Sequence, residues 1–173
     1  HWMTQNYKES YDMFTCSGIL FNHESPLRGL EFVTRKITDG VARIHRGETH
    51  CIELGNLNAS RDWGYAPEFV EGMYRMMQHD TADTFVLATN RSVTVKRFTE
   101  LAFEVIGIEI IWEGVGIKEQ GIDKKTGKEI VKVSEQYFRL AEVDALVGNP
   151  AKAKKILGWE PKINVEDLCK MMV

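Results

Sequence analysis

The chain has 173 residues, of which 43% are hydrophobic and 27% are charged, and its formal net charge is -3. This size allows one or two small domains with a packed core. The scattered lysines and arginines argue against a nucleic-acid partner. No apolar run is long enough to cross a membrane. Three widely spaced cysteines, Cys16, Cys51 and Cys169, form no Cys-x-x-Cys pair, so we expect neither a zinc site nor a disulfide framework, and a cytoplasmic location.

The first quarter of the chain has the pattern of a helix, a strand and a second helix. Aromatic residues along 2–12 predict a helix, and because His1-Trp2-Met3 opens inside this pattern without a cap, we expect that an N-terminal part is missing. The apolar, β-rich run at 14–21 is typical of a buried parallel strand. After a polar loop, apolar residues at helical spacing predict a second helix at 30–45.

The rest of the chain continues the alternation of strands and helices. Short apolar runs predict strands at 51–54, 84–88, 108–112 and 130–133. Start and stop residues predict helices from Pro67 to about Gln78, from Thr94 to about Ile106, from Pro150 to Leu157 and from Asn164 to about Met172. This order predicts the α/β class, with part of the chain in a larger doubly wound parallel sheet and part in a smaller C-terminal α/β lobe.

The sequence contains no self-sufficient motif of nucleotide or metal chemistry. The glycines from 114 to 127 lie in a charged loop and indicate turns rather than a Gly-x-Gly-x-x-Gly phosphate loop. There is no P-loop, no Gly-x-Ser-x-Gly elbow and no His-x-x-x-His pair. The residues by themselves therefore predict no complete catalytic constellation and no metal site.

Three polar groups nevertheless occupy positions where ligand chemistry is possible. Asn22 ends an apolar strand, where it either forms a turn or donates its amide to an oxyanion at the carboxyl edge of a sheet. Arg61 lies beside an acidic residue, so its guanidinium serves either a surface ion pair or a phosphate. Arg139 and Glu142 share one side of a helical turn, which suits either a local salt bridge or a phosphate and ribose contact.

In combination, the motifs of this chain closely resemble those of GDP-mannose 4,6-dehydratases. The matching segments occur in order along almost the whole chain: Gly18-Ile19-Leu20-Phe21-Asn22-His23-Glu24-Ser25-Pro26, Phe32-Val33-Thr34-Arg35-Lys36-Ile37-Thr38, Leu54-Gly55-Asn56 with Arg61-Asp62-Trp63-Gly64, Arg139-x-x-Glu142-Val143, and Gly148-Asn149-Pro150-x-Lys152-Ala153 with Leu157-Gly158-Trp159. The Arg-Asp-Trp-Gly or Leu-Gly-Trp piece alone would be weak, since related epimerases carry similar pieces, but the complete set is specific.

The resemblance implies an extended short-chain dehydrogenase/reductase whose N-terminal Rossmann domain binds NADP through a glycine-rich loop. In the family, a Tyr-x-x-x-Lys pair with a Thr and a Glu moves a hydride from the sugar C4 to NADP, removes water across C5 and C6, and returns the hydride to C6. The family places these groups before the first residue of this chain, so the resemblance implies no catalytic residue here and an inactive isolated chain. It also implies that 1–28 ends the NADP-binding domain, while 29–173 is mostly the GDP-sugar-binding lobe, with segments around 50–90 returning to the sheet.

Binding residues are implied where positions match the family motifs. They are Asn22, Val33, Lys36, Arg61, Arg139 and Glu142 for the GDP-sugar and His23 and Arg28 for NADP. Within this set Asn22, Lys36 and Arg61 match contacts to the GDP-sugar, chiefly its diphosphate, whereas Val33 matches a position beside the guanine. The cations must gather locally in a chain of negative net charge, so we expect Asn22, Lys36, Arg61 and Arg139 to form one anion site.

The chain departs from the usual family pattern at a few places. Leu27 replaces the first arginine of an Arg-Arg-Gly run, Leu140 replaces a proline, and the segment 117–135 is shorter than in many members. These departures leave the sugar open between GDP-mannose and GDP-heptose, and the full-length enzyme open between a homo-dimer and a homo-tetramer. A related GDP-sugar reductase or epimerase, and a nucleotide-binding module without activity, are the alternative functions.

Overall fold

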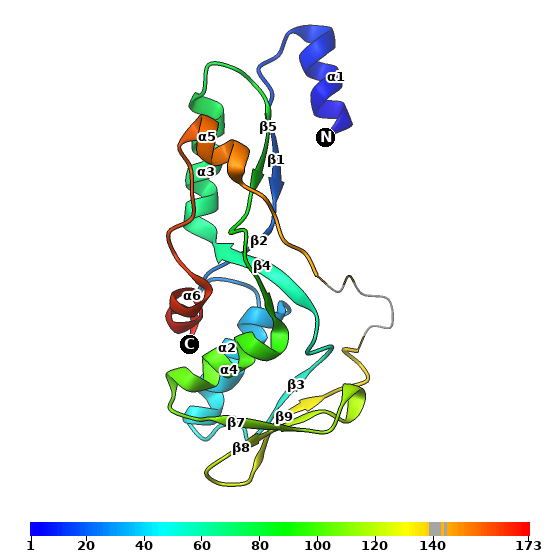
Figure 1. Ribbon diagram of the computed structural model, residues 1–173, viewed down its shortest axis with the longest axis vertical. Helices are drawn as coiled ribbons and strands as arrows, with labels where there is room; N and C mark the ends of the chain where they lie inside the picture. The colour runs from blue at the N-terminus through cyan, green and yellow to red at the C-terminus, as the bar shows by residue number, and fades with distance from the viewer. Residues whose placement is uncertain (139–142, 144) are drawn as a thin grey trace.

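The computed structural model describes residues 1–138, 143 and 145–173, and their helices and strands alternate along the chain (Figure 1). The helices are α1 (Trp2–Tyr11), α2 (Val33–His45), α3 (Ala66–Gln78), α4 (Val95–Val105), α5 (Ala151–Leu157) and α6 (Val165–Met172), with a 3-10 turn, η1 (Gly116–Lys118). The strands are β1 (Ser17–Leu20), β2 (Asn22–Glu24), β3 (Ile52–Leu54), β4 (Ser60–Tyr65), β5 (Thr84–Leu87), β6 (Ser92–Thr94), β7 (Ile110–Glu113), β8 (Gln120–Asp123) and β9 (Glu129–Val133). The α/β class is confirmed.

The strands form three small sheets that follow one another along the long axis of the molecule (Figure 1). The first sheet is the parallel pair β1-β5. The second has the order β2-β4-β6, in which β2 and β4 are parallel and β6 is antiparallel to β4. The third has the order β3-β9-β8-β7 and contains one parallel pair, β3 with β9. The second sheet therefore lies between the other two, and β4 is its central strand.

The described residues form two hydrophobic cores, and the middle sheet belongs to the larger one through Trp63 and Val93. The β5 core consists of Phe69, Met76, Phe85, Leu87, Ala153 and Trp159, and it joins β5 to α3 and α5. The larger α2 core packs α2 against α4 and α6 and extends to β3 and β9 through Leu54 and Val131. Each core buries the apolar face of amphipathic helices, which is the main source of stability for helices of this length.

Several helix boundaries follow the signals in the sequence. The hydroxyl oxygen of Thr94 accepts a hydrogen bond from the Arg97 amide at 3.0 Å, which caps α4. The side chain of Asn164 caps α6 in the same way by accepting from the Asp167 amide at 2.8 Å. Gly158 ends α5 in the left-handed conformation, with φ of 61°. These predictions are confirmed because a cap satisfies backbone groups that the helix itself cannot pair.

The strand predictions need correction at 14–21 and at β4, β6 and β8, which the sequence did not predict. The expected buried strand at 14–21 is instead the shorter β1 followed by β2, and Ile19 and Leu20 of β1 are 48% and 37% exposed. Within the described residues β1 has a single strand neighbour, β5, so its apolar side chains are only partly covered. The sequence pattern does not predict β4 at all, because Arg61 and Asp62 break the apolar alternation of a strand.

The structure explains how a strand can bury an aspartate at its centre. Asp62 is 0% exposed, and its carboxylate accepts four hydrogen bonds. One oxygen accepts from the amide of Thr89 at 2.8 Å and from its hydroxyl at 2.6 Å, and the other accepts from the amides of Asn90 at 3.0 Å and Gly148 at 3.1 Å. Asp62 therefore joins β4 to the turn after β5 and to the segment that leads into α5.

The structure also bears on membrane insertion. Across residues 1–138, 143 and 145–173, no helix has both the length and the apolar character that crossing a bilayer would require.

The Asp62 network predicts a specific loss of stability. We expect Asp62→Asn to lower the free energy of unfolding by ~2–4 kcal/mol, because the amide nitrogen would face two backbone N–H donors while hydrogen bonds to a charged group are lost. Urea denaturation would measure this loss, with Asp80→Asn as the control, because Asp80 is an exposed carboxylate at the end of the α3 segment. Equal midpoints for the two variants would contradict the structural role assigned to Asp62.

Candidate functional site

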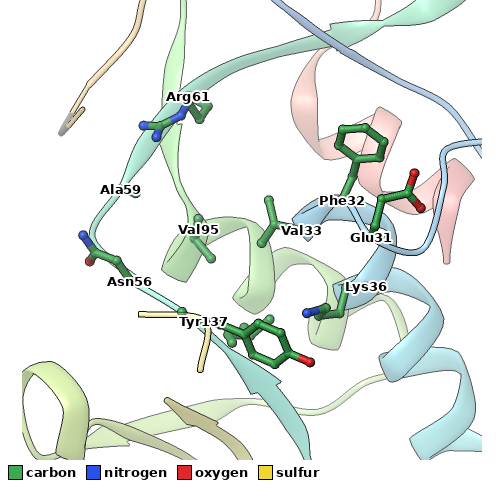
Figure 2. Close-up of a pocket in the computed structure, with 11 residues that line it drawn as sticks. Glu31, Phe32, Val33, Lys36, Asn56, Ala59, Arg61, Val95 and Tyr137 are labelled. Carbon is green, nitrogen blue, oxygen red and sulfur yellow. The ribbon is translucent and has the colours of Figure 1, made fainter. Parts of the chain in front are cut away.

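A cavity of about 570 Å³ opens between the α2 core and the middle sheet (Figure 2). Its lining residues come from the start of α2, the segment between β3 and β4, β4 itself, the start of α4, and the segment after β9: Glu31, Phe32, Val33, Lys36, Leu54, Gly55, Asn56, Ala59, Arg61, Val95 and Tyr137. The volume lies in the range of small-molecule sites. The wall combines apolar surface with two cations, Lys36 and Arg61, and one carboxylate, Glu31.

Lys36 lies on the second turn of α2 and contacts an aromatic ring across the cavity. Its Nζ atom lies 3.4 Å from the centroid of the Tyr137 ring, which is cation–π geometry. The Tyr137 carbonyl packs against Gly55, where an added Cβ would lie 2.3 Å from the carbonyl oxygen. Glycine at position 55 therefore allows the segment after β9 to approach β3 and to place Tyr137 in the wall.

Arg61 lies near the start of β4 and connects two parts of the cavity wall. Its Nη1 donates hydrogen bonds to the carbonyl oxygen of Ser60 at 2.9 Å and to that of Val143 at 2.7 Å. The segment at Ala145 and Leu146 lies beside β4, because the amide of Leu146 donates to the Ser60 carbonyl at 3.1 Å. The two hydrogen bonds of Nη1 hold the guanidinium at the edge of the cavity.

Asn56 is a lining residue to which the sequence analysis assigned no role. Its side-chain oxygen accepts a hydrogen bond from the Asn58 amide at 3.0 Å, so the oxygen serves the local turn and the amide nitrogen is the remaining polar group. Tyr137 was also missed. The available signals were the Leu54-Gly55-Asn56 motif for Asn56 and, for Tyr137, an aromatic residue two positions before Arg139.

The predicted binding residues fall into two groups in the structure. Val33, Lys36 and Arg61 line the same cavity, although 28 positions separate Val33 from Arg61 (61 minus 33). Asn22, His23 and Arg28 lie on β2 and in the loop after it, outside the residues that line this cavity. Arg139 and Glu142 lie outside the described residues, so the expected meeting of Arg139 with Asn22, Lys36 and Arg61 stays a prediction.

The β2 residues are nevertheless close in the fold to β4. Asn22 pairs with Trp63 and His23 pairs with Gly64 in the parallel register of the two strands. The His23 ring stacks on Phe69 with centroids 5.2 Å apart, and its Nδ1 lies 2.9 Å from the Phe21 carbonyl oxygen. The predicted cofactor contact His23 and the cavity cation Arg61 thus belong to one small sheet.

Arg28 extends from the loop after β2 and is held by two neighbours. Its guanidinium carbon lies 3.5 Å from the centroid of the Phe32 ring. Its Nε lies 3.1 Å from a carboxylate oxygen of Glu24 as an ion pair, but without the alignment of a hydrogen bond. The Arg28 side chain is 24% exposed, so the cation keeps access to solvent.

Glu24, at the end of β2, is a buried acid beside the site. It is 2% exposed, and its carboxylate accepts a hydrogen bond from the Thr34 hydroxyl at 2.7 Å. Burial raises the pKa of Glu24, while the hydrogen bond from Thr34 and the positive charge of Arg28 act in the opposite direction. The pKa of Glu24 rises because desolvation of the carboxylate exceeds the combined lowering by Thr34, Arg28 and His23.

Metal binding finds no support in the part of the chain that the structure describes. No three His, Cys, Asp or Glu side chains gather there as they would around a metal ion.

Sequence comparisons identify proteins that are similar to this chain over its whole length. Residues 1–172 match the family model described as GDP-mannose 4,6 dehydratase. GDP-mannose 4,6 dehydratase 2 of Caenorhabditis elegans is 56% identical over 173 residues, which are 100% of this chain and 45% of that protein. The Dictyostelium discoideum and Homo sapiens GDP-mannose 4,6 dehydratases are 51% and 47% identical over all of this chain, which spans 49% and 46% of their lengths. The chain thus spans about half the length of the curated relatives it matches.

Solved structures with the same fold include enzymes that act on nucleotide sugars. RMD from Pseudomonas aeruginosa complexed with NADPH superposes with a TM-score of 0.81 at 17% identity, covering 99% of this chain and 51% of that one. UDP-glucose 4-epimerase of Thermotoga maritima with UDP-glucose gives a TM-score of 0.71 at 22% identity, covering 99% and 48%. At this identity the likeness establishes the fold alone.

The raised pKa of Glu24 predicts how stability changes with pH. A pKa above the unfolded value contributes stability below the unfolded pKa, and this contribution is lost as the pH rises through the folded pKa. Because Glu24→Gln imitates the protonated side chain, we expect its free energy of unfolding to increase relative to the parent as the pH rises above the ordinary pKa of a glutamate. Urea denaturation on both sides of this pKa would test it, and a constant difference would show that Glu24 does not titrate abnormally.

Proposed function

Since the chain belongs to the GDP-mannose 4,6-dehydratase family, we propose that it forms the nucleotide-sugar-binding part of a longer enzyme. This enzyme converts GDP-mannose, or a close GDP-sugar such as GDP-heptose, to the GDP-4-keto-6-deoxy-sugar. The observation that carries the proposal is the convergence of Lys36 and Arg61 on one cavity from separate elements, α2 and β4. A diphosphate needs such converging cations, and a chain with a net charge of -3 must gather them locally.

The other walls of the cavity suit the remaining parts of a nucleotide. Val33 and Phe32 offer apolar surface for a base, and the ring of Tyr137 is an aromatic wall that already accepts a cation. Asn56 offers an amide donor for a carbonyl or phosphate oxygen. We propose that Asn22, Arg139 and Glu142 complete the GDP-sugar contacts, with Arg139 at a phosphate and Glu142 at the ribose.

NADP is the cofactor that this function requires, and it supplies the acceptor and donor of the hydride when it is bound. Two residues of this chain fit as part of its site. Arg28 is a partly exposed cation that stacks on Phe32, and such a cation suits a cofactor phosphate. His23 lies in β2 next to β4, and its ring is held by stacking on Phe69 of α3. We propose that 1–28 ends the NADP-binding domain and that 29–173 is mostly the GDP-sugar-binding lobe.

The proposal includes the inactivity of this polypeptide on its own. The chain contains no Tyr-x-x-x-Lys pair and no Gly-x-Gly-x-x-Gly loop. Exposed apolar side chains on β1 and α3, such as Ile19 and Tyr74, fit a surface that the rest of the enzyme covers. We propose a homo-dimer or homo-tetramer for the full-length enzyme, and a cytoplasmic location that suits the three free cysteines.

The role of Arg61 predicts a loss of ligand affinity. In the full-length enzyme, Arg61→Ala should weaken binding of GDP by ~1.5–3 kcal/mol, the range for a hydrogen bond to a charged group. Calorimetry with GDP would measure the change, with Arg46→Ala as the matched control, because Arg46 is an exposed arginine that pairs with Glu48 away from the cavity. An unchanged affinity in Arg61→Ala would remove the main support for the proposal.

The reaction itself has a direct assay. Incubation of the full-length enzyme and NADP with GDP-mannose or GDP-heptose should give a 4-keto product from one of the two, because the family reaction leaves a ketone at C4. An epimerised or reduced sugar nucleotide would favour the alternative of an epimerase or reductase. The 173-residue chain alone should give no product and bind GDP weakly, so tight GDP binding by this chain would contradict the view that it is an incomplete site.

A further inference from the structure

The buried carboxylate of Glu24 makes two contacts that together define the path of the next ten residues. Its Oε2 atom accepts a hydrogen bond from Thr34 in the first turn of α2 and lies 3.1 Å from Nε of Arg28 in the loop. The segment 25–32 connects Glu24 to α2 and contains Arg28. The loop is therefore tied at its middle and at the helix that follows it to a single atom at the end of β2.

This tie extends to the wall of the cavity through Phe32. The Arg28 guanidinium that faces Glu24 also lies 3.5 Å from the centroid of the Phe32 ring. Phe32 lines the cavity, and so does Val33, which immediately precedes Thr34 (Figure 2). The chain of contacts thus runs from Glu24 through Arg28 to Phe32 on one side, and from Glu24 through Thr34 to Val33 on the other.

We propose that Glu24 is a positioning residue for the nucleotide-sugar site, holding segment 25–32 in the shape that sets Phe32 and Val33 in the cavity wall and Arg28 beside them. The inference rests on the proposed function. It deepens that function because Glu24 connects Arg28, which is proposed to bind the cofactor, with Phe32 and Val33, which are proposed to contact the nucleotide base. Glu24 contacts neither ligand in this scheme and acts through its neighbours.

Stability alone gives little reason for a carboxylate at this position. A buried ion pair is often no more stabilising than well-packed apolar side chains of similar volume. The carboxylate does bring two elements together, because a single oxygen accepts a hydrogen bond from a hydroxyl on α2 and lies beside a guanidinium in the loop. Its contribution is therefore expected in the geometry of the site rather than in the folding free energy.

The test uses graded variants of the full-length enzyme in steady-state kinetics with its GDP-sugar. Glu24→Met fills a similar volume but removes both contacts, whereas Glu24→Gln keeps an oxygen that can accept from Thr34. The matched control is Glu119→Met, because Glu119 is also buried and pairs with a cation, Lys96, with Nζ and Oε1 2.6 Å apart. Thermal denaturation of each variant is recorded alongside the kinetics.

We expect Glu24→Met to raise KM for the GDP-sugar roughly tenfold while kcat changes less than about twofold, since uniform binding is lost without transition-state contacts. Glu24→Gln should recover most of the affinity, and Glu119→Met should leave KM unchanged.

An unchanged KM in both Glu24 variants, or an equal rise in Glu119→Met, would overturn the inference while the proposed function stands. If the parent enzyme neither binds nor converts a GDP-sugar, the proposed function fails first. Should Glu24→Met not fold, the KM of Glu24→Gln decides, with a rise of about threefold expected from the weaker tie to Arg28.

Discussion

The buried carboxylate of Asp62 is the interaction on which the arrangement of this protein depends. The described residues form two hydrophobic cores, and the burial of apolar surface within each core does not fix one core relative to the other. Asp62 supplies a directional link, since its four hydrogen bonds reach the turn after β5 and the backbone at Gly148. Gly148 can approach because it has no side chain, and an added Cβ would lie 2.2 Å from that of Ala88. A hydrogen-bonded charge thus sets the geometry that apolar packing leaves free.

The same strand carries the cation of the site. Side chains alternate along a strand, so while Asp62 points into the protein its neighbour Arg61 reaches the cavity on the other face. The position of Arg61 therefore depends on how firmly β4 is held. Lys36 reaches the cavity from a helix of the α2 core, where it faces Tyr137. Both cations therefore lie on elements of the α2 core, to which β4 contributes Trp63.

Two buried acids, Asp62 and Glu24, illustrate different costs of burying a charge. Asp62 has four donors, which replace the hydration that it loses. Glu24 has one hydroxyl and one imperfectly aligned guanidinium, and burial raises its pKa. The first acid joins the cores, and the second lies at the edge of the proposed binding site. An acid whose burial is less well compensated is more readily explained by a role in binding than by a role in folding.

The sequence by itself determined the class of the fold, most helix boundaries and the family. Caps such as Thr94 and Asn164 act within a few residues, so local sequence is enough to place them, and ordered motifs along the chain identify relatives without any coordinates.

Only the tertiary structure decided that β4 is a strand, that β1 is exposed, and that Lys36 and Arg61 share a cavity with Asn56 and Tyr137. These features depend on partners distant in the sequence: Asp62 can lie within a strand because Gly148 and Thr89 reach it, and Tyr137 can enter the wall because Gly55 leaves room for its backbone. Long-range contacts of this kind leave no periodic signal in the sequence, which is the physical reason that the residues of the site could be named in part but their meeting could not be derived.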